Sequence, residues 1–282
     1  MIGRRFWAAL AALLLVGGGA AGIWWWHSHS ADPPPQPPAV NMPADEDPTL
    51  AKVFEDARAK VLKEPRSAEA WGFYGKVLLA NGLGEDSRTC FAEAARLDTS
   101  DPRWPYFHGV AQQAIDPDPA LSYFREAARR VGNDDGLAAD AVRLRYAEAL
   151  TRKGQAAEAE GLLREVLRHR PDEPRALLEL GSLAMDAGDL DTAEANLLHC
   201  LRCPDSRLAQ QRATTRLSRL YLQKGNKAEA ERYRNLARSY PRDGDGPDPY
   251  SEEYKELLVG RRARLLRAEG LLRSGELQEA VG

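Results

Sequence analysis

Apolar residues are arranged in two different ways along the chain. Residues 6–26 form an apolar run without a charged side chain, whereas from Thr49 onward apolar residues recur with the three- and four-residue spacing of helices. Glycine or proline interrupts the helical pattern at short intervals. The pattern predicts an all-α protein in which one apolar amino-terminal segment precedes many short helices.

The apolar run has the features of a membrane-spanning helix. Its length is about what a helix needs to cross a bilayer. Arg4 and Arg5 lie in the basic segment 1–5 before it, and three consecutive tryptophans, which favour the headgroup level, end it. Because basic flanks stay in the cytoplasm, residues 6–26 are predicted to be the signal-anchor helix of a single-pass inner (cytoplasmic) membrane protein, with its N-terminus cytoplasmic and the remaining chain periplasmic.

A cleaved signal peptide is the alternative. The small residues from Gly17 to Gly22 could contain a cleavage site near Ala20, which would make the protein secreted or periplasmic. The apolar run continues past them through Ile23 and the tryptophans, and this continuation favours the anchor. Residues 27–48 are rich in proline and are predicted to form a stiff, extended linker between the membrane and the next domain.

Glycines in the helical part recur at a fixed period. Gly154 and Gly188 are 34 residues apart, and the same kinds of residue surround each. Apolar and small residues precede the glycine: Tyr146, Ala147 and Leu150 in the first unit, and Leu180, Gly181 and Ala184 in the second. An alanine and a leucine follow it: Ala159 and Leu163, then Ala193 and Leu197. This period indicates a repeat in which two helices approach closely at the small residues.

A unit nearer the start of the chain contains enough characteristic residues to indicate which kind of repeat this is. Its characteristic residues are Trp71, Tyr74, Gly75, Leu78, Gly82, Phe91 and Ala94. Their offsets resemble the tetratricopeptide repeat, a helix-turn-helix unit of about 34 residues. The resemblance implies an α-solenoid over residues 68–242, with repeats at about 68–101, 102–135, 140–173, 174–207 and 211–242.

The two ends of the repeat array differ. Residues 49–67 are predicted to be an N-terminal capping helix or half repeat. Residues 243–250 form a loop of Asp, Gly and Pro, and residues 251–282 begin an incomplete sixth repeat that lacks the polar capping helix of a solenoid. This incomplete repeat predicts that the chain is a piece of a longer protein. The apolar face of the capping helix consists of Phe54, Ala57 and Val61.

Few residues have the spacing of a catalytic or metal site. Cys200 and Cys203 form a paired-thiol motif, but Cys200 falls at a small core position late in a helix, so packing is favoured over redox or metal chemistry. The histidines His108, His169 and His199 lack ligand spacing, and the aspartates around Asp243 do not fit a calcium loop. Phosphate-binding, dinucleotide-binding and lipase motifs are missing. The sequence therefore predicts no catalytic residue, metal or cofactor, and no enzyme.

Net charge and composition bear on the class of partner and on the kind of source organism. The 39 Lys and Arg against 42 Asp and Glu give a net charge of -3, which argues against nucleic acid as the partner. Richness in Ala and Arg favours a bacterial origin. The three cysteines are too few for a disulfide framework, so apolar burial is expected to hold the fold.

The resemblance implies a protein-binding function. In stacked helix pairs, the first helix of each repeat lines a concave face that can hold a peptide or helix of another protein. The partner-binding candidates at inward-facing offsets are Tyr106, Glu148, Arg152, Arg175, Arg212 and Arg219; the other inward offsets are Glu69, Lys76, Arg103, Gln113, Ser182 and Gln223. We expect a membrane-anchored, non-enzymatic scaffold on the periplasmic side. The alternative is the anchor and spacer of a longer protein whose catalytic or cofactor domain lies beyond Gly282.

Overall fold

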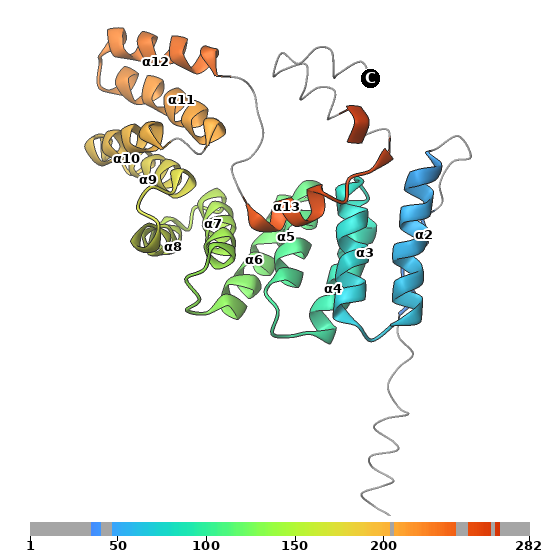
Figure 1. The fold of residues 1–282 in the computed structure, drawn as a ribbon. Helices are drawn as coiled ribbons and strands as arrows, with labels where there is room; N and C mark the ends of the chain where they lie inside the picture. The colour runs from blue at the N-terminus through green and yellow to red at the C-terminus, as the bar shows by residue number, and fades with distance from the viewer. Residues whose placement is uncertain (1–34, 41–46, 204–205, 241–247, 261–262, 266–282) are drawn as a thin grey trace, which may run out of the picture. The chain divides into compact units, whose positions relative to one another are not determined.

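The computed structural model describes residues 35–40, 47–203, 206–240, 248–260 and 263–265. The chain divides into two compact units, residues 1–36 and 37–282, and nearly all described residues belong to the second. Within the described ranges every regular element is helical (Figure 1). The predicted signal-anchor helix over 6–26 lies outside these ranges. Among the helices that the structure describes, none is long and apolar enough to span a bilayer.

The helices are short and follow one another closely in sequence. They are α2 (Pro48–Lys63), α3 (Ala68–Ala80), α4 (Gly84–Leu97), α5 (Arg103–Ile115), α6 (Pro117–Val131), α7 (Leu137–Arg152), α8 (Ala156–His169), α9 (Pro174–Asp186), α10 (Leu190–Arg202), α11 (Arg207–Gln223), α12 (Lys227–Ser239) and α13 (Pro249–Lys255).

Helices α3 to α12 pack as five pairs, in each of which a short turn joins the first helix to the second. The first helices also contact one another, since α3 contacts α5, α7 contacts α9, and α9 contacts α11. We call the surface formed by α3, α5, α7, α9 and α11 the first-helix face. The sequence placed the third and fifth repeats at 140 and 211, whereas α7 begins at Leu137 and α11 at Arg207. For α11 the start is set by Ser206, whose hydroxyl caps the backbone N–H of Ala209.

Small residues allow the two helices of a pair to approach closely, as the sequence predicts. A Cβ atom added to Gly75 would lie 2.7 Å from the Phe91 ring, and one added to Gly109 would lie 2.7 Å from the Phe124 ring. A Cβ atom added to Gly181 would likewise lie 2.7 Å from the Leu197 side chain. In each case a residue of the first helix makes room for a large side chain on the second.

The turn glycines adopt a backbone conformation that other residues avoid. Gly154 and Gly188 have φ values of 73° and 80°, in the left-handed region. Each follows a first helix and reverses the chain into the second. The two glycines 34 residues apart therefore mark the turns inside the third and fourth pairs.

The amino-terminal helix α2 packs on α3. It buries Phe54, Ala57 and Val61, the three residues predicted to form its apolar face. Part of the predicted linker also packs here, because the Tyr74 hydroxyl donates to the carbonyl of Pro38 at 2.8 Å and Arg58 Nε donates to the same carbonyl at 3.1 Å. Pro38 of the predicted linker therefore lies against α2 and α3.

Helix α13 has an unexpected position. It contacts α3 and α7, although α4 to α6 and α8 to α12 lie between them in the sequence (Figure 1). The sixth repeat that the sequence predicts over 251–282 falls mostly outside the described residues. Its described beginning lies on the first-helix face, where it contacts α3 and α7 and where the Tyr250 ring packs on Tyr106 and Phe107 of α5.

Candidate functional site

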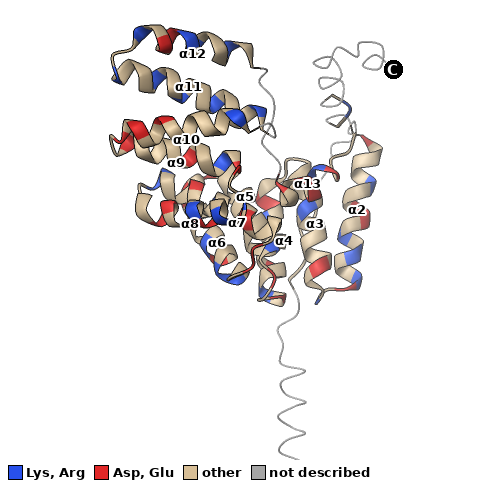
Figure 2. Ribbon diagram, turned by 60° about the vertical axis from the view of Figure 1, so that its left-hand side comes forward, with Lys and Arg blue, Asp and Glu red and all other residues tan. Residues whose placement is uncertain are grey.

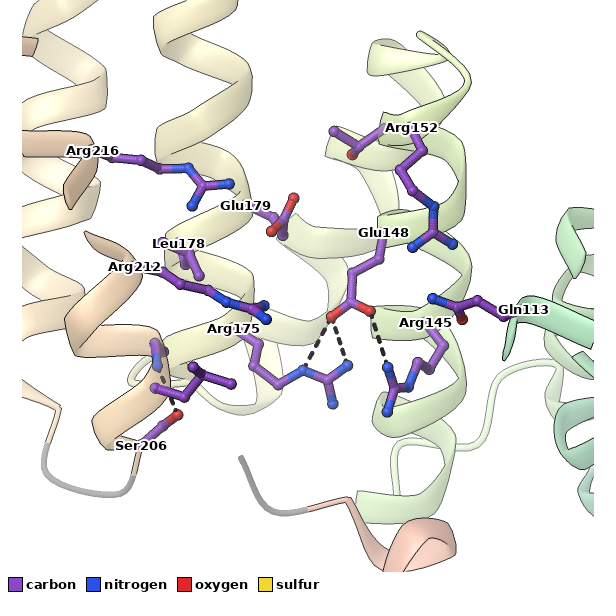
Figure 3. Close-up of a pocket in the computed structure, with 13 residues that line it drawn as sticks. Gln113, Arg145, Glu148, Arg152, Arg175, Leu178, Glu179, Ser206, Arg212 and Arg216 are labelled. Carbon is purple, nitrogen blue, oxygen red and sulfur yellow. Dashed lines mark hydrogen bonds and ion pairs between the residues drawn. The ribbon is translucent and has the colours of Figure 1, made fainter. Parts of the chain in front are cut away.

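A pocket of about 430 Å³ opens on the first-helix face between α5, α7, α9 and α11. It is lined by five arginines and two glutamates together with small and apolar residues (Figure 3). The arginines are Arg145, Arg152, Arg175, Arg212 and Arg216, and the glutamates are Glu148 and Glu179. The pocket is therefore rich in positive charge, although the chain as a whole has a net charge of -3.

Helix spacing brings these side chains together. Residues three or four apart lie on the same face of a helix, and Arg145 and Glu148 are so related on α7, as are Arg212 and Arg216 on α11. Stacking of the repeats then places the α7, α9 and α11 sets beside one another. Charged residues of both signs are spread over the helices, so it is this convergence that distinguishes the pocket (Figure 2).

Glu148 lies at the centre of an ion-pair cluster. Its Oε1 accepts from Arg175 Nη2 at 2.6 Å and from Arg175 Nε at 3.2 Å, and its Oε2 is 3.6 Å from Arg145 Nη1 (Figure 3). Burial raises the pKa of Glu148, but the charges of Arg175 and Arg145 outweigh burial and leave that pKa below its usual value. Glu148 is therefore a fixed anion that orients two guanidinium groups.

The other arginines of the pocket are available to a ligand. Within the described residues, Arg152, Arg212 and Arg216 form no hydrogen bond or ion pair, and Arg152 and Arg212 are exposed. Glu179 lies near them, and burial followed by the charge of Glu148 raises its pKa despite Arg216 and Arg212. Guanidinium groups bind carboxylates or phosphates in bidentate fashion, so the pocket can accept an anionic group.

Four of the six predicted binding residues line this pocket: Glu148, Arg152, Arg175 and Arg212. Arg219 lies farther along α11, beside a neighbouring hollow that Ser182 and Gln223 also line. These positions lie on the first-helix face, but their role in binding remains a prediction.

Tyr106 is in a different situation. Its side chain is fully buried, and its hydroxyl donates to the carboxylate of Asp248, which precedes α13. Arg145 Nη2 is 3.4 Å from the same carboxylate. Tyr106 therefore contacts the chain's own carboxyl-terminal segment and not the open pocket.

Sequence reasoning missed Arg145, Glu179, Arg216 and Asp248. Three of them carried a signal, because each stands three or four residues from a predicted residue on the same helix: Arg145 from Glu148, Glu179 from Arg175, and Arg216 from Arg212. Asp248 carried none, since it lies in a segment expected to be a loop between repeats.

The cysteines are packed thiols. Cys90 and Cys200 are fully buried and Cys203 nearly so, and none of the three forms a disulfide. Burial raises the pKa of Cys200 to about 12, which keeps its thiol protonated and unreactive. This agrees with the expectation that Cys200 belongs to the core.

One cluster outside the pocket has metal-binding residue types. Asp172, His199 and Cys203 each offer a ligand atom within 4.8 Å of the others. His199 Nε2 is 2.7 Å from Asp172 Oδ1, which is a hydrogen-bond distance, and the Cys203 thiol donates to the His199 carbonyl at 3.4 Å. These are donor types that zinc takes, but hydrogen bonds within the chain already engage them.

Two sequence profiles of the tetratricopeptide repeat match the chain, over residues 51–102 and 150–199. No curated protein sequence matches it significantly.

Several solved structures share the fold at low sequence identity. PilF of Pseudomonas aeruginosa superposes with a TM-score of 0.56 at 16% identity, over 74% of this chain and 90% of its own. PilW, described as a type IV pilus biogenesis factor, gives 0.54 at 17%, over 76% and 100%. YrrB, described as a tetratricopeptide protein with an unusual peptide-binding site, gives 0.50 at 18%, over 65% and 90%. Helix pairing, period and profiles agree: the chain contains tetratricopeptide repeats, and its described residues form an all-α solenoid of that type.

Proposed function

We propose that this protein is a non-enzymatic scaffold that binds an acidic segment of a partner protein in the arginine-lined pocket of its first-helix face. The observation that carries the proposal is the convergence of Arg152, Arg212 and Arg216, which form no hydrogen bond or ion pair among the described residues, beside the ordered pair Arg145 and Arg175. Guanidinium groups held in place lose little entropy when they bind a carboxylate.

The shape of the pocket supports a peptide as the ligand. It runs across α5, α7, α9 and α11, so an extended chain can contact several repeats at once. Apolar lining residues, Leu178 and Leu208 among them, lie between the arginines and can contact side chains that alternate with acidic ones. The fold shared with YrrB is consistent with peptide binding, although identity of 18% carries no site residue across.

Charge reversal of one pocket arginine tests the proposal. A fluorescein-labelled dodecapeptide in which glutamate alternates with alanine serves as the probe, and its fluorescence anisotropy reports binding to the full chain. Arg212→Glu is expected to weaken binding at least about ten-fold, equivalent to ~1.4 kcal/mol.

Arg168→Glu is the matched control, because Arg168 is exposed on the second helix α8 and does not line the pocket. Its affinity for the peptide is expected to stay within about two-fold of the unaltered chain. Equal weakening by both variants would attribute binding to overall charge, and no binding of the acidic peptide by the unaltered chain would refute the pocket.

We further propose that residues 6–26 anchor the protein in the inner membrane with the repeats on the periplasmic side. Support comes from the uncharged apolar run, the preceding arginines and the tryptophans at its end. Carbonate washing of membranes should leave the full chain in the pellet and release a chain lacking residues 1–30. Two results would favour a cleaved signal peptide over the anchor: release of the full chain by carbonate, or an intact-protein mass showing that the mature chain starts after Ala20.

A further inference from the structure

The described residues 248–260 and 263–264 lie along the amino-terminal half of the first-helix face. They begin beside α7, where Arg145 contacts Asp248, and pass α3, where Lys76 contacts Glu253. They end beside α2, where Arg264 Nη2 is 2.9 Å from Asp47 Oδ2. Repeats of a solenoid contact their neighbours in sequence, so a segment that returns over a hundred residues to the first three pairs is not another stacked repeat.

Asp248 anchors one end of the segment. Its Oδ1 caps α13 by accepting from the backbone N–H groups of Tyr250 and Ser251, and its Oδ2 accepts from the Tyr106 hydroxyl and from Arg145. The residue is 1% exposed. Burial raises the pKa of Asp248, but the Tyr106 hydrogen bond and the Arg145 charge outweigh burial and lower it. A carboxylate held this way is recognised by charge and by position.

Two tyrosines four residues apart fill the aromatic part of the groove. The Tyr250 ring centroid lies 4.7 Å from that of Tyr106 and 5.8 Å from that of Phe107. The Tyr254 ring meets Phe107 edge-on at 6.3 Å. Tyr250 is buried, so this contact removes a large apolar surface from water.

Polar contacts hold the remainder of the segment against α3. Lys76 Nζ is 3.0 Å from Glu253 Oε2, and Lys76 is itself buried on α3. The Asn81 side chain then makes two hydrogen bonds to the backbone of the segment: its Nδ2 donates to the Leu257 carbonyl and its Oδ1 accepts from the Val259 N–H, each at 3.3 Å. The Asn81 amide therefore satisfies one donor and one acceptor of the backbone that follows α13.

We propose that α3, α5 and α7 form a second binding groove, specific for a short helix with an aspartate cap and two tyrosines four residues apart, and that residues 248–259 occupy it as an internal ligand. A partner segment with this chemistry binds only by displacing the internal one. The groove shares Arg145 with the arginine-lined pocket but is otherwise made of different residues, so it stands whether or not the pocket binds an acidic peptide.

A labelled peptide of residues 246–260 tests this proposal on the full chain. In the unaltered chain the tethered segment competes at an effective concentration of about a millimolar, so the peptide is expected to bind weakly. A chain carrying Asp248→Asn, Tyr250→Ala and Glu253→Ala keeps the groove and weakens its occupant, and its tethered segment has no charge at position 253 that could pair with residue 76. It is expected to bind the peptide at least about ten-fold more tightly.

Charge reversal separates recognition from loss of structure. Adding Lys76→Glu to that chain should abolish binding of the natural peptide, and a peptide with Glu253→Lys should restore it, because the ion pair is re-formed with its charges exchanged. Rescue cannot arise from an unfolded groove. Equal affinity of the peptide for the altered and unaltered chains, no binding to the altered chain, or failure of the exchanged peptide to restore binding would each overturn the proposal.

Discussion

Gly72 illustrates how single residues set the geometry of this fold. A Cβ atom at this position would lie 2.0 Å from Cζ3 of the Trp104 ring, which is itself buried. The indole therefore lies directly on the α3 backbone and fixes the distance between the first two repeats. No side chain larger than hydrogen fits there without moving Trp104.

Gly72→Ala is accordingly expected to lower the free energy of unfolding by about 1–3 kcal/mol, since overpacking outweighs the better helix propensity of alanine. Gly161→Ala is the control, because nothing lies within 4 Å of a Cβ added to Gly161, which is on α8. It should raise the free energy of unfolding by up to about 1 kcal/mol. Urea unfolding measures both, and destabilisation by both variants would contradict the role given to Trp104.

His108 makes stability depend on pH. It is 9% exposed and stacks on Tyr123, and burial, followed by the charge of Arg88, lowers its pKa to about 4. Between the usual histidine pKa of about 6.5 and this value, the unfolded chain binds a proton that the folded chain does not. Stability from neutral His108 is therefore complete above about pH 6.5 and is lost as the pH falls towards 4.

Protonation of His108 is expected to lower the free energy of unfolding by about 3 kcal/mol over this pH range. The His108→Gln variant should not show this loss, because glutamine does not titrate. Urea unfolding of both proteins at several pH values provides the comparison. The unaltered chain should lose more stability than the variant between about pH 6.5 and pH 4. Parallel curves for the two proteins would show that His108 binds its proton equally well in both states.

Residue-scale reasoning from sequence identified four of the residues that line the pocket because the offset within a repeat fixes which face a side chain takes. It missed Arg145, Glu179 and Arg216, for which only the three- or four-residue helical offset was needed. It missed Asp172 as the partner of His199, because Asp172 lies in the turn between α8 and α9 and His199 lies 27 residues later, on α10.

At the scale of single helices, α2 shows what a terminal element must do. It buries one face against α3 and leaves the other in water. Phe54→Ala should lower the free energy of unfolding by about 3 kcal/mol, because it leaves a cavity beside α3. Leu62→Ala on the same helix should change it by less than about 0.5 kcal/mol, since Leu62 is 48% exposed. Equal effects in thermal or urea unfolding would mean that α2 does not cover the array.

The element that sequence reasoning could not place is α13. Asp248 caps it and Pro249 begins it, whereas the sequence was expected to form a loop over 243–250. Its position depends on Tyr106, Arg145, Lys76 and Asn81, which are far away in sequence and contact it only once the repeats have stacked. Periodicity predicts which helices form and which faces they bury, but it contains no information about a segment that leaves the period.

At the scale of the whole molecule, net charge and local charge point in opposite directions. The chain is acidic, yet its first-helix face gathers five arginines in one pocket. Affinity for the glutamate-alanine peptide should therefore fall at least about ten-fold between ~50 mM and ~500 mM salt, because salt screens these charges. Anisotropy titrations in sodium chloride measure this dependence. An affinity that does not change with salt concentration would indicate that the peptide binds through apolar contacts elsewhere.

The measurement that tests the scaffold account most directly is hydrogen–deuterium exchange of the full chain with and without the glutamate-alanine peptide. The account predicts slower exchange in α7, α9 and α11 when the peptide is bound, no change in the second helices α8, α10 and α12, and loss of the effect in Arg212→Glu. Slower exchange confined to the second helices, or the same pattern in Arg212→Glu, would contradict binding in the arginine-lined pocket of the first-helix face.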